Sequence, residues 1–414
     1  MRRFVLVALA LAGLAPHAAS AAPLTADGAV QIALKHSTSM VQANAAVSSA
    51  SAGMWNAYAG VLPRVDASLG RSREAFSPAW NYDYSKGGGL SGSWSLFSLS
   101  SWANWSAARG NLRSATLDRA ATRADVALGT KRQFYEVVKA MHLARVSTQA
   151  LRLARDDERR VRALFEVGSV SKSDLLKARV RTSQSELDSL LSEHNVTAQR
   201  IALAGQIGVG EETLGEIDST LTAQMQPVDP AAVLADARAA RPDLKAAEAA
   251  FRAAEMSMRA AQLNRLPSVS ASADWTNGAG DGGPWTHSKS ASLALSMPVF
   301  DLTVEGGIAA ARARLLSARE TRDALVRNLD SEVRQTLLAY QEASERESLA
   351  RRTVESAGEN LNLVQQKYNV GSATILDLID SQVQYQRAQS DLVSALAAIR
   401  VAEASLERVR GRGV

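Results

Sequence analysis

The chain has 414 residues and a formal net charge of +5, from 47 basic and 42 acidic residues. It contains no cysteine, which excludes disulfides, thiolate metal sites, cysteine nucleophiles and a lipid on an amino-terminal cysteine. The charges are interspersed, and no basic stripe with stacking aromatics indicates a nucleic-acid partner. The composition therefore predicts a mildly basic, solvated protein that is long enough for two large structural units.

The first 21 residues have the features of a secretory signal peptide. Two arginines precede an apolar run over residues 4–15, and Ala19-Ser20-Ala21 fits the small-x-small cleavage rule. The apolar run is too short to span a bilayer as a helix, and the alternative is a buried amino-terminal helix. No later stretch approaches 18 consecutive apolar residues. We therefore expect an exported chain without a helical membrane anchor.

Internal repetition divides the rest of the chain. The segment that starts with Leu62-Pro63 reappears at Leu266-Pro267, an offset of 204 residues. The segment 165–169 reappears as 368–372, an offset of 203 residues. Two unrelated matches in nearly one register indicate duplication of a unit far longer than a solenoid repeat. The expected division is a signal peptide over 1–21, a first repeat with its linker over 22–227 and a second repeat over 228–414.

Each repeat is expected to contain a helix, two short strands, a very long helix, a tight glycine turn and a return helix. In the first repeat the helix is expected over 25–61, the strands over 65–70 and 90–96, and the long helix over 101–165. The turn is expected at 168, and the return helix runs to about 207. In the second repeat the helix is expected over 229–266, the strands over 269–275 and 293–299, and the long helix over 304–368. The turn is expected at 371, and the return helix runs to about 409. The segment 208–227 mixes Gly, Thr and Pro, which predicts a linker with little structure of its own.

The long helices carry coiled-coil spacing. Phe134, Val137, Met141 and Ala144 step by three, four and three residues, and the seams are rich in alanine, which lets helix axes approach closely. At about 1.5 Å per residue, a helix of this length reaches roughly 100 Å. Such a helix suits a structure that crosses a wide aqueous compartment.

The strands have a period of two. Val65, Ala67 and Leu69 alternate with polar or small residues, and each strand approaches the ten residues that a tilted strand needs to cross a bilayer. The alternative is a soluble hairpin packed on the helices. Tryptophans lie in or beside the strands, where an interfacial aromatic belt is expected: Trp94, Trp102, Trp105, Trp275 and Trp285.

Four strands cannot close a barrel, and an open strand edge in lipid leaves backbone groups unpaired at a cost of several kcal/mol each. Other copies of the chain must therefore supply strands. Two copies would give eight strands, whose interior side chains fill, whereas three copies give twelve strands and an open lumen. We expect an α+β membrane protein, a homotrimer with a twelve-stranded transmembrane β-barrel and a long α-helical coiled-coil barrel.

The sequence resembles the TolC-like outer membrane factor family over essentially the whole mature chain. The two-fold repeat, the two Leu-Pro strand entries and the two Val-Gly turns carry the resemblance, with Arg241-Pro242-Asp243-Leu244 and Met297-Pro298-Val299-Phe300. It implies a trimeric channel in the cell outer membrane, surrounded by outer-membrane lipid and extending into the periplasm. It also implies docking to a periplasmic adaptor (membrane fusion) protein and an inner-membrane transporter, in a tripartite efflux pump or a type I secretion system.

The resemblance also implies two sets of site residues. The helix tips are expected to contact the adaptor through Val167, Gly168, Ser169, Val370, Gly371 and Ser372. The first tip departs from the family, which often has Val-Gly-Leu there, and each glycine can equally serve only the turn. The second set is the aperture. Asp377 and Asp380 match the paired aspartates that ring the closed inner aperture in the family, and Asp174 is the matching residue of the first repeat. Such carboxylate rings favour cations, whereas the alternative is solvated acids on a polar helix face.

The sequence contains no motif that indicates an enzyme. The five histidines are scattered, and the chain has no nucleophile elbow, phosphate-binding loop or dinucleotide fingerprint. We therefore expect no enzyme, no cofactor and no metal site. The second hypothesis is a periplasmic or surface coiled-coil scaffold without a pore, which would explain the long helices but not four paired strands of bilayer length.

Overall fold

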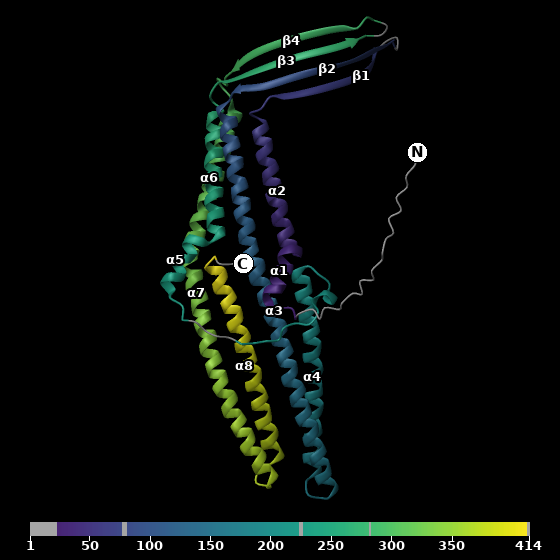
Figure 1. The fold of residues 1–414 in the computed structure, drawn as a ribbon, viewed down its shortest axis with the longest axis vertical. Helices are drawn as coiled ribbons and strands as arrows, with labels where there is room; N and C mark the ends of the chain where they lie inside the picture. The colour runs from purple at the N-terminus through teal and green to yellow at the C-terminus, as the bar shows by residue number, and fades with distance from the viewer. Residues whose placement is uncertain (1–22, 77–80, 223–226, 281–282, 412–414) are drawn as a thin grey trace, which may run out of the picture.

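The computed structural model describes residues 23–76, 81–222, 227–280 and 283–411. The signal peptide expected over residues 1–21 lies outside this part of the chain. The described chain is an elongated helical bundle with a four-stranded sheet at one end (Figure 1). Its elements are α1 (Ala26–His36), α2 (Thr38–Ala59), β1 (Arg64–Phe76), β2 (Asn81–Phe97), α3 (Leu99–Glu166), α4 (Lys172–Ile207), the 3₁₀ helix η1 (Glu211–Leu214), α5 (Pro230–Ala240), α6 (Pro242–Leu263), β3 (Ser268–Ala279), β4 (Thr286–Ser296), α7 (Leu302–Asn369) and α8 (Ile375–Val409).

The elements recur at nearly constant offsets. α1 and α5 begin at residues 26 and 230, α3 and α7 at 99 and 302, and α4 and α8 at 172 and 375. α3 and α7 have 68 residues each, so the expected pair of very long helices is confirmed. Each is about 100 Å long at the usual helical rise. The boundary between residues 227 and 228 stays a prediction.

The first helix of each repeat is divided in two, so the unbroken helices expected over 25–61 and 229–266 are wrong. Proline disfavours helical backbone in the residue before it, and Arg241 before Pro242 is extended, with ψ 123°. The first repeat breaks at Ser37 without a proline, also with extended backbone at ψ 139°. The Ser37 hydroxyl accepts a hydrogen bond from the Met40 N–H and caps α2. The apolar periodicity continues across the break at Ser37 and hides it, whereas Pro242 marks the second break in the sequence.

A glycine lies against each break. Gly208 and Gly411 follow α4 and α8 and have positive φ angles of 76° and 72°. A Cβ atom on Gly208 would lie 2.5 Å from the His36 carbonyl oxygen, and one on Gly411 would lie 2.9 Å from the Arg241 nitrogen. Only glycine combines this backbone conformation with so close an approach. The ends of the return helices are thereby seated on the α1–α2 and α5–α6 breaks.

The segment after α4 has more structure than the expected linker over 208–227. It forms η1, and Ile217 makes a parallel bridge with Leu24, supported by the hydrogen bond from the Leu24 N–H to the Glu216 oxygen at 2.7 Å. Leu214 and Ile217 are buried. The prediction of little structure is wrong because these two apolar residues join the core of the first repeat.

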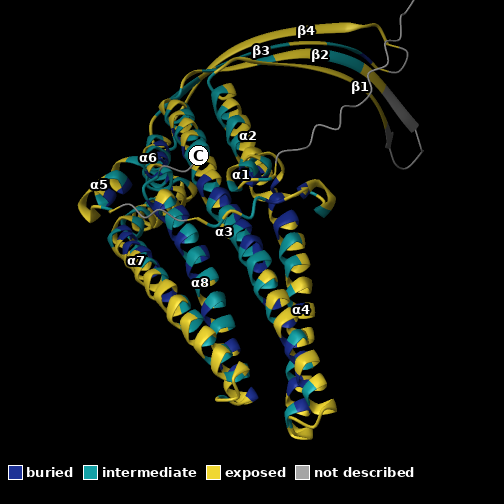
Figure 2. Cartoon of the chain, turned by 60° about the horizontal axis from the view of Figure 1, so that its bottom comes forward, coloured by how far each residue is buried: buried dark blue, intermediate teal, exposed yellow. Residues whose placement is uncertain are grey.

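Two equivalent cores lie at mid-length of the bundle. In the first, α1 packs on α3 and α4 around Phe134 and Leu203. In the second, α5 packs on α7 and α8 around Leu337 and Leu406, each 203 residues later. Figure 2 shows buried residues where the helices meet, whereas the strands are mostly exposed. Each short helix therefore anchors one long helix to its return helix.

The helices have a fixed order on either side of these cores. Toward the sheet, α2, α3, α6 and α7 are neighbours in that order, and toward the tips the order is α4, α3, α8 and α7 (Figure 1). The central contact between α3 and α6 is close, since a Cβ atom on Gly110 would lie 2.9 Å from the Cβ of Ala253. Small residues thus permit the close helix approach that the alanine-rich seams predict.

The sheet is an antiparallel meander in the order β1-β2-β3-β4. Its registers place Arg64 opposite Ser93, Leu90 opposite Trp275 and Ser268 opposite Ser296. The expected strands are present, but β4 ends at Ser296, because Pro298 has no N–H to continue the ladder. The last three residues of the strand expected over 293–299 are therefore not strand.

The two faces of the sheet differ, as the period of two predicts. One face is apolar and open to solvent in the single chain, with Leu69 94% exposed and Leu295 73% exposed. The other is rich in serine, and hydroxyl pairs bridge neighbouring strands, with Ser72 and Ser85 oxygens 2.6 Å apart and those of Ser272 and Ser292 2.8 Å apart.

Aromatic side chains gather where the strands meet the helices. The Trp94 indole nitrogen donates to the Val61 carbonyl oxygen at 3.1 Å. The Trp105 ring lies 5.5 Å from Tyr58 and 5.8 Å from Trp102. At the start of β4, Trp285 lies 5.5 Å from the Lys86 ammonium group. The sheet thus has aromatic residues near both of its ends.

Candidate functional site: the helix tips and their acidic residues

Both helical hairpins reverse through the same turn. Gly168 and Gly371 have φ angles of 77° and 75°, which a residue with a side chain rarely adopts. The Ser169 N–H donates to the Leu164 oxygen and the Ser372 N–H to the Lys367 oxygen, each at 2.8 Å. This is the Schellman pattern of helix ends, and it satisfies carbonyl groups that would otherwise be unpaired.

The tips expose apolar side chains. Val167 is 75% exposed and Val370 is 77% exposed. The side chains of Ser169 and Ser372 are also exposed, since the backbone N–H groups of these residues, not their hydroxyls, form the turn. A turn alone has no need of an exposed valine, so each tip has an unused apolar surface.

Asp174 and Asp377 are equivalent residues, 203 positions apart, and both lie in the first turn of a helix, bonded to its N-cap residue. The Asp377 carboxylate accepts from the Thr374 N–H at 2.8 Å and the Thr374 hydroxyl at 2.7 Å. The Asp377 N–H donates to the Thr374 hydroxyl at 3.2 Å, which completes a capping box. Asp174 accepts from the Ser171 hydroxyl at 2.7 Å. These hydrogen bonds hold the pKa of both carboxyl groups below the ordinary value, so both are charged at neutral pH.

The two tips differ three residues farther along. In the first repeat, Lys177 lies 3.3 Å from the Asp174 carboxylate. In the second, the equivalent position is Asp380, which accepts from the Gln384 amide at 2.7 Å. Asp377 and Asp380 are exposed one turn apart on α8. The second tip therefore has two carboxylates where the first has an ion pair.

A small core joins the two tips within one chain. It contains Val161 of α3, Leu175 of α4 and Leu378 of α8, with Tyr368 of α7 packed against it. Asp174 and Asp377 thus stand at the starts of two helices that share one apolar cluster. The structure places all the predicted site residues at this end of the bundle, and the distance between aspartates of different copies depends on their assembly.

Three polar contacts between the hairpins are absent from the sequence prediction. The Gln382 amide of α8 donates to the buried Asp157 carboxylate of α3 at 2.6 Å. Arg181 of α4 donates to Gln386 at 2.9 Å, and Arg160 donates to Asn369 at 3.2 Å. Burial raises the pKa of Asp157, although the hydrogen bond from Gln382 lowers it. Single polar residues inside a helical pattern give no sequence signal for such partners.

An ion-pair network surrounds the α5–α6 break. Arg241 donates to Asp243 at 2.5 and 3.0 Å and to Glu332 of α7 at 2.5 Å. Arg408 of α8 pairs with the same Glu332 and with Asp125 of α3 at 2.9 Å. The Arg-Pro-Asp motif of the sequence therefore ties the second repeat's short helices to α7, and Arg408 links that repeat to the first.

Burial alters the acid–base behaviour of this network. Burial lowers the pKa of Arg241, but the hydrogen bonds that Arg241 donates to Asp243 and Glu332 raise the pKa above its ordinary value, so the guanidinium is always charged. Burial raises the pKa of Asp243, but the hydrogen bonds from Arg241 outweigh it and hold the pKa below the ordinary value. The charged pair is the stable form at neutral pH.

The described residues contain no group of three or more His, Cys, Asp or Glu side chains that could hold a metal ion. His142 lies beside the Ser219 carbonyl oxygen at 2.8 Å, a contact that holds the segment after η1 on α3. Within the described part of the chain, no helix has a stretch long and apolar enough to cross a membrane.

Comparison with protein families gives one match over most of the chain. The model of the family described as outer membrane efflux protein matches residues 29–209 and 233–412. A comparison with the sequences of curated proteins found no match.

Solved structures share the fold. The CmeC outer membrane channel of Campylobacter jejuni aligns with a TM-score of 0.81 and 17% identity, over 94% of this chain and 86% of that one. The outer membrane protein VceC of Vibrio cholerae aligns with a TM-score of 0.78 and 20% identity, over 93% of this chain and 96% of that one. The open state of the MtrE outer membrane channel of Neisseria gonorrhoeae aligns with a TM-score of 0.78 and 20% identity, over 93% of this chain and 88% of that one. At these identities the similarity establishes the fold.

The Arg241 network predicts a pH-dependent loss of stability. Arg241→Met leaves Asp243 and Glu332 without their buried partner, and we expect a loss of about 3 kcal/mol at neutral pH. The pKa of Asp243 is lower in the folded chain than in the unfolded chain, where it is about 3.9. The ion pair therefore stabilises the fold above this unfolded-state pKa, and the stabilisation is lost as pH falls through the folded-state pKa. The difference in the free energy of unfolding between Arg241→Met and the unchanged protein should therefore become smaller below about pH 4. Unfolding followed by circular dichroism measures it.

Arg259→Met is the matched control on α6. Arg259 pairs with Glu255 at 2.7 Å, but the two side chains are 57% and 36% exposed. Its loss should change stability by less than about 0.5 kcal/mol. Equal effects of the two substitutions would contradict a special role for Arg241.

Proposed function

This chain belongs to the outer membrane efflux protein family, and we propose that it is the exit duct of a tripartite efflux pump or a type I secretion system. It is an outer membrane channel that extends into the periplasm. In the proposed role it passively conducts substrates that an inner-membrane transporter delivers. The family consists of channels, and we propose no catalytic activity.

The two-faced sheet is the observation that carries this proposal. Its apolar face exposes Val65, Leu69, Leu293 and Leu295 in the single chain, where water would surround them. In a barrel these side chains contact lipid, and the serine face lines a water-filled lumen. A coiled-coil scaffold without a pore has no use for an exposed apolar sheet, and family membership also favours the channel.

The registers of the sheet indicate how copies of the chain join. Shifting the β1–β2 pair Arg64–Ser93 by 204 and 203 residues gives Ser268–Ser296, which is the β3–β4 pair. The two hairpins are therefore equivalent, and β2 and β3 form the joint between them. β1 and β4 are the outer strands of the described sheet. A second copy can continue the sheet if its β1 pairs with β4 as β3 pairs with β2.

This equivalence fixes an expected register between copies. Gly92 pairs with Ala273 at the β2–β3 joint. Shifting Gly92 forward by 203 and Ala273 back by 204 gives Leu295 of one copy opposite Leu69 of the next. The helices can follow the same rule, with α7 meeting the next copy's α2 as α3 meets α6. Three copies then close twelve strands around a lumen, so we propose a homotrimer.

We place the aperture at the tips of this trimer. Asp377 and Asp380 would form two adjacent rings of three carboxylates, which raise the local negative potential and select cations. Both residues are exposed in the single chain, and their carboxylates accept hydrogen bonds from the neutral groups of Thr374 and Gln384, which supports this role. Asp174 would add a third ring of weaker effect, because Lys177 compensates its charge.

We also propose that the tips dock a periplasmic adaptor. The support is the exposed apolar Val167 and Val370, which flank turns with open space around both glycines. Small residues at Gly168, Ser169, Gly371 and Ser372 would let an adaptor helix approach closely.

The proposed register can be tested by disulfide formation, because the chain has no cysteine of its own. Residues directly opposite on antiparallel strands have Cα atoms about 4.5–5.5 Å apart, within the range that a disulfide spans. Leu69→Cys combined with Leu295→Cys should give covalent oligomers up to a trimer on oxidation, seen by non-reducing electrophoresis. The control, Val65→Cys with Leu295→Cys, is displaced by about 13 Å along the strand and should give none. Cross-links in the control alone would refute the register.

The aperture can be tested by single-channel recording in planar bilayers. Asp377→Asn with Asp380→Asn removes the charges and keeps an oxygen that can accept the capping hydrogen bonds. Cation selectivity should fall and block by trivalent cations should disappear. Asp174→Asn, where Lys177 already offsets the charge, should have a smaller effect. Unchanged selectivity and block in the double variant would exclude these residues from the aperture.

Adaptor docking can be tested by bulky substitution beside the turns. Ser169→Trp and Ser372→Trp leave the glycines and the turn hydrogen bonds unchanged, so trimers should form. Export should fall because the larger side chains obstruct the adaptor, measured as substrate accumulation in cells. Ser183→Trp, on the exposed side of α4 away from the tip, is the control. Normal export by both tip variants would leave the tips as turns only.

A further inference from the structure

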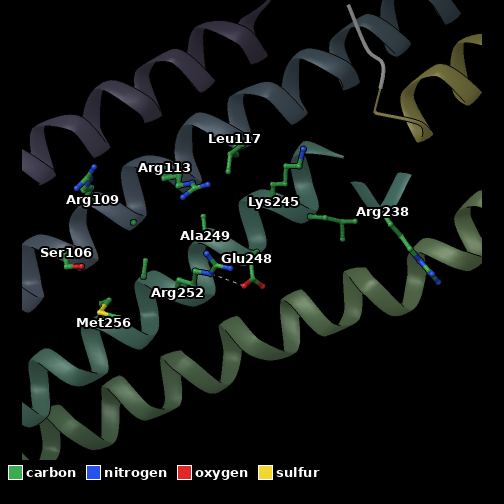
Figure 3. Close-up of a pocket in the computed structure, with 13 residues that line it drawn as sticks. Ser106, Arg109, Arg113, Leu117, Arg238, Lys245, Glu248, Ala249, Arg252 and Met256 are labelled. Carbon is green, nitrogen blue, oxygen red and sulfur yellow. Dashed lines mark hydrogen bonds and ion pairs between the residues drawn. The ribbon is translucent and has the colours of Figure 1, made fainter. Parts of the chain in front are cut away.

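A basic groove lies between α3 and α6 (Figure 3), in the half of the bundle next to the sheet (Figure 1). It has a volume of about 750 Å³. Its charged lining is Arg109 and Arg113 of α3, Arg238 of α5, and Lys245, Glu248 and Arg252 of α6. Five of these side chains are basic and one is acidic.

The single acidic group of the lining is already engaged. Glu248 accepts from Arg252 at 3.0 Å, the contact drawn in Figure 3, and Arg322 of α7 approaches its other oxygen at 3.7 Å. The lining therefore has an excess of positive charge that its own residues do not neutralise. Repulsion between these cations is unfavourable for folding, and a concave surface concentrates their field.

The first repeat shows that a helix in this position does not need the charges of α6. α2 is the counterpart of α6, since the two helices begin at residues 38 and 242, and α2 has no charged residue at all. The counterparts of Lys245, Glu248 and Arg252, 204 residues earlier, are Val41, Asn44 and Ser48. The equivalent helix thus forms and packs on α3 without them. Helix formation therefore does not account for the charges of α6.

The groove stays open in the proposed trimer. α3 and α6 are the central helix pair of the chain on this side of the bundle, and the proposed trimer joins neighbouring copies at α2 and α7. Its floor is low, because Gly110, Ala249 and Ala253 lie between the basic side chains.

We propose that this groove binds a small polyanion with two or more phosphate or carboxylate groups. Arg109 and Arg113 are four residues apart on one face of α3, so their guanidinium groups can bind neighbouring anionic groups in the paired geometry that arginine favours. Lys245 and Arg252 supply positive charge from α6 on the other side. The volume is in the usual range of small-molecule sites.

Calorimetric titration of the detergent-solubilised protein with pyrophosphate and, separately, with citrate tests the proposal. At low ionic strength we expect saturable binding of at least one anion, weakened by added salt. Arg109→Gln combined with Arg113→Gln should weaken it at least tenfold, since charge-assisted hydrogen bonds are lost. The control is Arg312→Gln, at the position of α7 that corresponds to Arg109 and is also exposed. Absence of binding by both anions, or equal weakening by the control, would overturn the proposal.

The source of the ligand is decided by single-channel recording with the anion that binds. A change in current that the double variant abolishes places the groove in the lumen and the ligand among the transported molecules. Binding without a change in current places the groove on the outer surface, in contact with periplasmic anions. The groove lies within one chain, so a protein that failed to form trimers would still show the calorimetric binding, and the two proposals fail separately.

Discussion

An unpaired strand edge in hydrocarbon is the constraint on which the rest of this structure depends. Each backbone group left without a partner in lipid costs several kcal/mol, and a sheet of four strands has two edges. The sheet of the described chain has the order β1-β2-β3-β4, so β1 and β4 are its edge strands. Duplication offers a solution, because the joint between the two hairpins can be repeated between copies of the chain. The proposed trimer is that repetition carried to closure.

The helices transmit this arrangement over a long distance. A helix of 68 residues has no core of its own, and each repeat anchors it through one short helix at mid-length. Glycines with positive φ seat the return helices on the breaks, and the Arg241 network binds the second break to α7. Small residues such as Gly110 and Ala253 set the helix separation. The anchors at mid-length leave both ends of the bundle free for separate tasks.

The backbone is nearly symmetric between the repeats, and the charges are not. Both tips use the same turn and an aspartate bonded to the N-cap residue, but Lys177 follows in the first repeat and Asp380 in the second. α2 is uncharged, whereas its counterpart α6 lines a basic groove. Folding energy depends mainly on the repeated apolar pattern and caps, so side chains that face water are free to diverge. The differences between equivalent positions are therefore the best indicators of function in this chain.

Much of this architecture can be predicted from the sequence. The offset between Leu62-Pro63 and Leu266-Pro267, the period of two in the strands and the heptad spacing around Phe134 determined the repeat, the element types and the two-faced sheet, because each is a local pattern. The break at Ser37 escaped prediction because the apolar spacing runs through it, and the order of the segment around Ile217 depends on a distant core. The pairing of Asp157 with Gln382, the shared use of Glu332 by Arg241 and Arg408, and the groove between α3 and α6 were decided only by tertiary structure. Their partners lie up to 225 residues apart, and no local pattern records which helix faces another across that separation.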